Sequence, residues 1–191
     1  MKVLAISGSP RKKGNTEYFL TQALAHMSAS GFETELLTLD DKVIKPCRAC
    51  LACRKELRCT QEGDDFHAIY DKMTAADGII VGSPVHFSGP APALVALLDR
   101  AGYCSRQSRR FFSGKVGAPV AVARRAGHNF TFAWLLLWFF VNDFIIPGST
   151  YWNVGMAGEG GARDAEADKE GLDTIAHFAK NMARVLTALH A

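Results

Sequence analysis

Apolar runs and segments of mixed polarity alternate along the whole of this chain. The runs at residues 3–6, 78–82 and 116–123 contain no polar side chains, which is typical of parallel strands buried on both faces. Weaker apolar runs predict two further strands, one over residues 32–39 and one that begins at residues 144–146. Between the strands, helical spacing of apolar residues and capping signals predict helices over residues 15–31, 64–75, 91–100, 130–141 and 164–189.

This alternation predicts one α/β domain over residues 1–191. Strands that alternate with helices form a parallel sheet whose two faces are covered by right-handed crossovers. Five strands with this spacing predict a flavodoxin-like three-layer sandwich with strand order 2-1-3-4-5. The connection at about residues 40–63 is long and rich in cysteine, and long connections in compact domains are usually functional. A second loop, over residues 155–161, is rich in glycine.

The helix predicted at residues 130–141 is apolar on every side. It is well short of the roughly 20 apolar residues that cross a bilayer, so no membrane association is expected. A helix of this kind is covered on all faces by its own core or by another subunit. We expect its outer face, with Trp134 and Trp138 one turn apart, to form an interface in a homodimer or a dimer of dimers. Packing within the core is the alternative.

Composition narrows the class of protein further. The formal net charge of +3 and the 21% of charged residues are too weak a basic excess to indicate nucleic-acid binding. The start of the chain lacks the features of a signal peptide. A chain with five cysteines and no such signal is expected in the reducing cytoplasm, where cysteines are ligands or buried thiols. Cys104 is interpreted as a small core residue.

Four cysteines stand close together within the long connection, in the pattern C-x2-C-x2-C-x5-C. Thiols at this spacing can all face one small space, which suits a [4Fe–4S] cluster whose irons each take one thiolate. A zinc site is the second interpretation, although zinc sites more often use two separated C-x2-C pairs. A cysteine loop without metal is the third. The predicted metal ligands are Cys47, Cys50, Cys53 and Cys59.

A polar, basic loop follows the first predicted strand and leads into a helix. In a sheet of this order, ligands bind beyond the carboxyl ends of strands 1 and 3, and a helix start favours an anion. Asn15 or Thr16 can cap this helix. The loop matches neither a dinucleotide nor a Walker motif, so a single terminal phosphate is the better fit. The residues proposed to hold it are Ser9, Arg11, Gly14, Asn15 and Thr16.

The third predicted strand ends in a loop that offers an imidazole, an aromatic ring and backbone groups beside the first loop. A flat heterocycle finds stacking surface and hydrogen bonds in such a place. Together the two loops indicate a nucleotide with one phosphate and a broad ring system, and flavin mononucleotide (FMN) is that ligand. The residues expected to frame the ring are Pro84, Val85, His86, Phe87, Ser88 and Gly89.

With these motifs in view, the chain resembles the iron–sulfur flavoproteins, a branch of the NADPH-dependent FMN reductase-like family. The similar segments are SGSPRKKGNT, CRACLACRKELRC with Asp64-Asp65, ADGIIVGSPVHF and the LLDR of residues 97–100. The resemblance implies a flavodoxin-like fold, FMN at a dimer interface and a [4Fe–4S] cluster on the cysteines. His86 stands where the motif commonly has tyrosine. The third flavin loop, often glycine-rich, here begins with Arg124, a further candidate for the flavin site.

Three functions are carried forward from the sequence. The first is electron transfer between a ferredoxin-like donor, the cluster, FMN and a small acceptor, with the cofactors supplying the chemistry and no side chain assigned as catalytic. The second is an NAD(P)H-dependent FMN or quinone reductase without a working cluster. The third is a non-enzymatic module that senses metal or redox state. The identity of the electron donor distinguishes the first function from the second. Electron turnover by a bound flavin distinguishes both from the third.

Overall fold

Five parallel strands form the centre of the molecule in a computed structural model that describes residues 1–158 and 164–191. The strand order is β2-β1-β3-β4-β5, which confirms the predicted flavodoxin-like topology. Each of the first four strands lies within two residues of its predicted position, and the fifth does not. The strands are β1 (Lys2–Ser7), β2 (Glu33–Thr38), β3 (Gly78–Pro84), β4 (Val116–Ala123) and β5 (Val154–Met156).

The helices follow the predicted order with some changes of length. The helix after β3 continues seven residues past its expected end at residue 100, and the last helix begins five residues late, behind a short 3-10 turn, η1 (Asp164–Ala167). A short helix also forms inside the cysteine-rich connection. The helices are α1 (Asn15–Ala29), α2 (Cys53–Glu56), α3 (Phe66–Ala75), α4 (Pro92–Gln107), α5 (His128–Val141) and α6 (Lys169–Leu189).

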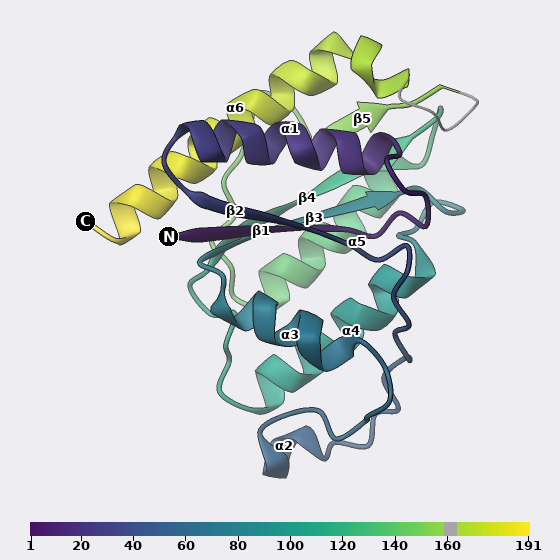
Figure 1. The fold of residues 1–191 in the computed structure, drawn as a ribbon, viewed down its shortest axis with the longest axis vertical. Helices are drawn as coiled ribbons and strands as arrows, with labels where there is room; N and C mark the ends of the chain where they lie inside the picture. The colour runs from purple at the N-terminus through teal and green to yellow at the C-terminus, as the bar shows by residue number, and fades with distance from the viewer. Residues whose placement is uncertain (159–163) are drawn as a thin grey trace.

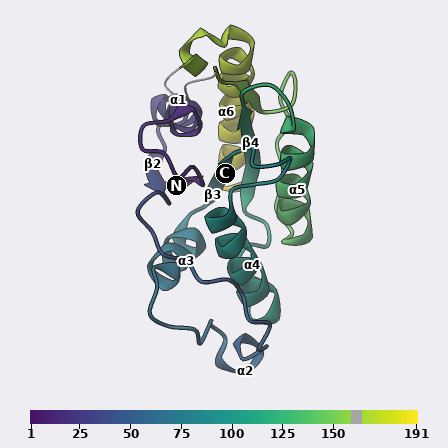
Figure 2. The same cartoon turned by 90° about the vertical axis from the view of Figure 1, so that its right-hand side faces the viewer.

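Helices cover both faces of the sheet and divide the core into two layers. Helices α1 and α6 lie on one face, and α3, α4 and α5 lie on the other (Figure 1; Figure 2 shows the same layers from the side). Apolar side chains of β1 and β3 point alternately into these layers, with Val3 in one and Leu4 in the other, whereas the valines of β4 pack into the layer under α1 and α6. The cysteine-rich connection, with α2, hangs beyond α3 and α4 at the end of the molecule farthest from α6.

The predicted position of the fifth strand was wrong. Residues 144–146 make only an isolated bridge, between Ile145 and Val116, and β5 forms eight residues later. The cause lies in β4, where Gly117 and Ala121 donate their N–H groups toward this edge, to Ile145 O (3.0 Å) and Asn153 O (3.0 Å). The residue midway between them is Pro119, which has no N–H to donate. The chain therefore leaves the edge and returns at β5.

The predicted glycine-rich loop is divided by the end of β5. Gly155 and Met156 belong to that strand, and residues 159–161 of the loop lie outside the described residues. Gly155 packs so closely on Phe19 that an added Cβ would lie 2.2 Å from its ring. Among the described residues, no helix is long and apolar enough to cross a membrane.

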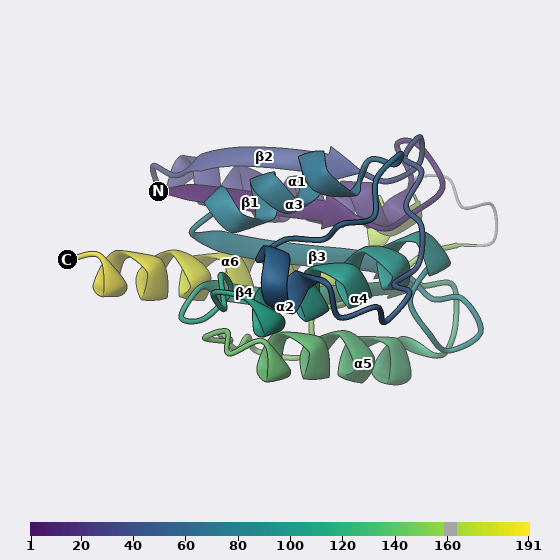
Figure 3. The same ribbon diagram turned by 90° about the horizontal axis from the view of Figure 1, so that it is seen from below.

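Helix α5 has a buried face and an exposed apolar face. Trp138 is buried, and its indole Nε1 donates to the Leu98 carbonyl of α4 at 2.8 Å. The expectation that Trp138 lies on the outer face was therefore wrong, whereas Trp134 does reach the surface. Figure 3 shows that α5 is the outermost element on its face of the sheet. Its exposed apolar residues are Phe130, Trp134, Leu137, Phe140 and Val141.

Candidate functional site

A cleft of about 440 Å³ opens at the carboxyl ends of β1, β3 and β4. This is the edge at which doubly wound sheets bind their ligands. The cleft gathers the predicted residues of three separate loops into one place. The predicted residues that line it are Ser9, Arg11, Gly14, Asn15, Thr16, Pro84, Val85, His86 and Arg124.

The first loop presents free backbone donors to the cleft. Helix α1 is capped by Gly14, and no side chain accepts a hydrogen bond at the cap, so the expected capping by Asn15 or Thr16 was wrong. The first N–H groups of a helix have no partner within the helix and, with the helix dipole, they attract an anion. Asn15 uses its Oδ1 to accept from Ala165 N–H at 3.1 Å, which leaves its amide NH2 as the available donor.

The second loop makes a tight turn between His86 and Gly89, which exchange two backbone hydrogen bonds of 2.8 and 2.9 Å. The central residues, Phe87 and Ser88, both have positive φ, 49° and 65°. Such a backbone is costly for an aromatic residue and is characteristic of functional sites. Phe87 points fully into solvent. Among the described residues, Phe87, Ser88 and Gly89 do not line the cleft, although they were expected to frame a ring.

The third loop, which follows β4, packs directly on the second. Gly127 has a φ of 89°, and a Cβ there would lie 2.7 Å from Val85 and 3.2 Å from the Ser88 hydroxyl. This close approach holds the two loops together beside the cleft. Several further lining residues were not predicted, although they stand inside the first loop, at the end of β4 or in the glycine-rich loop predicted over residues 155–161. These residues are Pro10, Val122, Ala123, Ala157 and Gly158.

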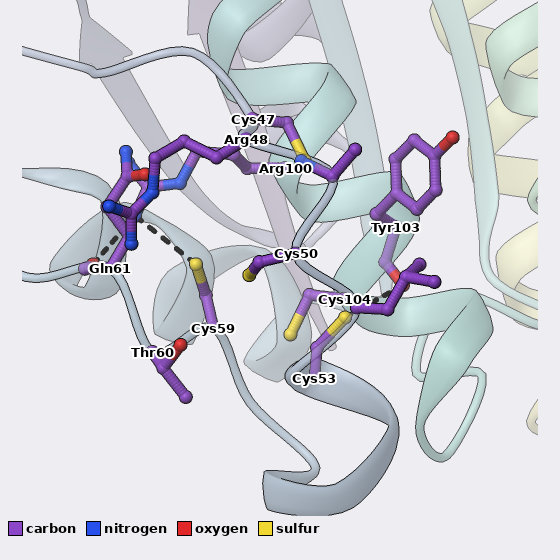
Figure 4. Close-up of a pocket in the computed structure, with 12 residues that line it drawn as sticks. Cys47, Arg48, Cys50, Cys53, Cys59, Thr60, Gln61, Arg100, Tyr103 and Cys104 are labelled. Atoms are coloured by element: carbon purple, nitrogen blue, oxygen red, sulfur yellow. Dashed lines mark hydrogen bonds between the residues drawn. The ribbon is translucent and has the colours of Figure 1, made fainter.

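The four cysteines of the connection line a second, smaller pocket against α4 (Figure 4). Cys47, Cys53 and Cys59 are partly buried, Cys50 is exposed, and all four thiols are free. Arg100, Tyr103 and Cys104 of α4 form the rest of the wall together with residues 48, 49, 51, 60 and 61. Among the described residues, no three histidine, cysteine, aspartate or glutamate side chains are already arranged around a single metal position.

The backbone of the cysteine segment is sharply turned. Ala49 and Leu51, on either side of Cys50, both have positive φ, 51° and 58°, although neither is glycine. One consequence is that Ala49 N–H donates to Cys47 Sγ at 3.4 Å. Conformations of this kind cost about 1–3 kcal/mol each and persist where the surroundings impose them, often at ligand sites. The donor set, four cysteine thiols on one turned segment around one pocket, is the kind that holds an iron–sulfur cluster.

Burial affects the thiols of this pocket unequally. Burial raises the pKa of Cys53, and the neighbouring Cys50, Cys59 and Cys47 raise it further. Burial also raises the pKa of Cys104, which lies inside the protein. Its interpretation as a small core residue agrees with its burial.

The cleft and the cysteine pocket lie at opposite ends of α4. The second loop of the cleft ends shortly before Pro92, where α4 begins, and the pocket wall includes Tyr103 and Cys104 near its end. At 1.5 Å of rise per residue, Pro92 lies roughly 12 Å along the helix from Arg100 and roughly 18 Å from Cys104 of the pocket wall. The two sites share no lining residue.

Comparison with known proteins finds a family model and relatives that agree with one another. A family model described as NADPH-dependent FMN reductase matches residues 1–159. An iron-sulfur flavoprotein of Methanocaldococcus jannaschii is 38% identical over 193 residues, covering 97% of each chain. One of Methanosarcina thermophila is 36% identical over 188 residues, covering 97% of this chain and 95% of the other. The crystal structure of RosB shares the fold, with a TM-score of 0.79, 17% identity and coverage of 100% of this chain and 80% of the other.

Proposed function

Because the chain belongs to the NADPH-dependent FMN reductase family and, within it, to the iron–sulfur flavoproteins, we propose that it passes electrons between a ferredoxin-like donor, a [4Fe–4S] cluster, FMN and a small acceptor. Its class, an FMN-dependent oxidoreductase, follows from the family. The proposal of electron transfer through a cluster rests on one observation. Four cysteines surround one pocket on a chain that also has, at the edge of the sheet, a cleft suited to bind a phosphate. When bound, the two cofactors supply the electron chemistry.

In this proposal the cleft holds FMN by its two ends. The N–H groups at the start of α1, with Arg11 and Thr16, hold the phosphate, because an anion is favoured by a helix start and by a guanidinium. Pro84, Val85 and His86 contact the ring from the end of β3, and Arg124 lies at the ring's other side, after β4. The turn holds Phe87 away from the cleft, so Phe87 can contact a flavin ring only where a second molecule of the protein packs against it.

The apolar outer face of α5 supports a homodimer. Phe130, Leu137 and Phe140 expose 71%, 65% and 75% of their surface on one helix, and contiguous apolar surface of this kind marks an association site. A second copy of the chain is the simplest occupant, since twofold dimers are the commonest symmetric assembly. Because α5 begins directly after the loop that carries Arg124, this interface borders the cleft.

Replacing Arg11 and Thr16 together with alanine is expected to weaken FMN about 10- to 100-fold and riboflavin little. A charge-assisted hydrogen bond contributes about 1.5–3 kcal/mol, and riboflavin has no phosphate to receive one. Fluorescence titration of the flavin-free protein with each ligand measures the difference. Lys12→Ala is the matched control, because Lys12 stands in the same loop but pairs with Asp40 at 3.6 Å, outside the cleft. Equal losses for both ligands would mean that these side chains support the loop and do not read the phosphate.

A reductase that takes hydride from NAD(P)H is the second candidate, favoured by the description of the family model. Mixing the protein with stoichiometric NADPH without oxygen separates the two functions. Slow bleaching of the flavin by NADPH and fast bleaching by a reduced ferredoxin-type donor support the first proposal. Fast bleaching by NADPH that is unchanged when the cysteines are replaced supports the second.

A further inference from the structure

Arg100 is the largest fully buried side chain of the described residues, with 2% of its surface exposed. It belongs to α4 and lines the cysteine pocket together with the four predicted ligands (Figure 4). A buried guanidinium needs partners for its charge and its five N–H donors. The partners of Arg100 show what it does.

The guanidinium of Arg100 connects both ends of the cysteine segment to α4. Nη1 donates to the Lys45 carbonyl at 3.2 Å, two residues before Cys47. Nη2 donates to the Gln61 carbonyl at 2.9 Å, two residues after Cys59, and to Cys59 Sγ itself at 3.4 Å. One side chain therefore fixes the entry and the exit of the segment and contacts a thiol between them.

The charge of Arg100 is balanced inside the protein. Its Nη1 forms a short ion pair with Asp64, whose side chain is completely buried, and its Cζ lies 3.9 Å above the Phe66 ring. Burial alone raises the pKa of Asp64, but hydrogen bonds from Lys45 N–H and Arg100, with the charge of Arg100, hold that pKa below its usual value. Asp64 also accepts from Lys45 N–H at 2.8 Å, so the pair is part of the same scaffold.

We propose that Arg100 is a positioning residue for the cysteine-ligated centre, which holds Cys59 in place and raises the reduction potential of the centre by donating a hydrogen bond to its sulfur. This inference rests on the proposed function. Hydrogen bonds to the sulfurs are among the features that set the potential of iron–sulfur clusters, and partners of the ligands orient them. Arginine suits this role because its guanidinium stays protonated and presents its donors in a rigid fork.

The structure also gives a reason to expect a polar group beside this guanidinium. Arg100 Nε is buried and has no hydrogen-bond partner among the described residues, and buried polar groups are rarely left in that state. Cluster sulfide and thiolate sulfur are both acceptors, so the donor set of Arg100 fits an anionic sulfur centre better than a plain apolar core.

Arg100→Lys tests the inference, with Arg106→Lys as the matched control. Both arginines are on α4, but Arg106 donates to the Val141 carbonyl and is absent from the cysteine pocket. We expect Arg100→Lys to keep its iron and sulfide while its reduction equilibrium constant falls about tenfold, which is about 59 mV for one electron. The control keeps the native potential. Full cluster loading with an unchanged potential in Arg100→Lys would overturn the inference.

Two further measurements keep the test decisive if Arg100→Lys folds poorly. Pulsed EPR of the reduced native protein, carrying isotopically labelled arginine, should detect a guanidinium nitrogen coupled to the cluster, and no coupling would overturn the inference. In the metal-free native protein, amide exchange over residues 45–61 should be slower than in Asp64→Asn, because that change loosens the scaffold; equal rates would contradict the positioning role. If the native protein itself binds no iron, the failure lies with the proposed function instead.

Discussion

Replacing Cys50 or Cys53 with serine is expected to abolish the iron–sulfur cluster and to leave FMN bound at its native affinity. A serine hydroxyl is a poor substitute for a thiolate in holding iron, so the loss should be nearly complete. The flavin is unaffected because the cysteine pocket and the cleft share no lining residue and lie at opposite ends of α4. Iron and sulfide analysis, together with flavin titration of each variant, measures both effects.

Cys104→Ala is the matched control for these variants. Cys104 lines the same pocket but lies outside the four-cysteine motif, and it is buried against the core. We expect it to keep its cluster and to lose about 1–2 kcal/mol of folding free energy from the small cavity. Loss of iron in Cys104→Ala with retention in Cys50→Ser would mean that the ligand set has been misassigned. Loss of FMN along with iron would mean that the two sites are coupled.

The second large effect is expected on the outer face of α5. Trp134→Glu combined with Phe140→Glu should convert a dimer into monomers and weaken FMN at the same time. Both side chains are exposed, and two buried carboxylates in an apolar interface are costly. Light scattering measures the assembly, and flavin titration measures the affinity.

Trp138→Ala is the contrasting variant on the same helix. Trp138 is buried, donates to the Leu98 carbonyl, and packs at 5.6 Å between ring centroids against Phe112. Its removal should lower the free energy of unfolding by about 3–5 kcal/mol, as seen in denaturant titration, without a specific effect on assembly. A native protein that is a monomer with full FMN occupancy would contradict the proposed interface.

The sequence predicted the sheet well where burial on both faces leaves a strong signature. The strand β4 and the central residues of β1 and β3 are apolar and buried, so the positions of these strands could be predicted from local pattern alone. The edge strand β5 has only three residues, and the apolar run at residues 144–146 is a stronger local signal. Pro119, which prevents continuous pairing along β4, was visible in the sequence, but its effect depends on which way its backbone faces.

The site residues that directly follow strands could be predicted from the sequence. The residues whose position depends on tertiary packing could not. The loops after β1 and β3 meet because the topology brings their strand ends together. The sequence of α5 is apolar on every side, so it does not show that Trp138 faces the core and Trp134 faces outward. Arg100 occurs in a motif that looks like the polar end of a helix, and only its neighbours in space, Asp64, Gln61 and Cys59, show that it is buried at the cysteine pocket.

The most direct test of the central claim is anaerobic purification followed by an absorption spectrum with iron, sulfide, zinc and flavin analysis on the same sample. The account predicts flavin bands on a broad iron–sulfur shoulder, with iron and sulfide equal to one another and one cluster for each FMN. Zinc in place of iron, or cysteines without any metal in a protein that holds FMN, would contradict it.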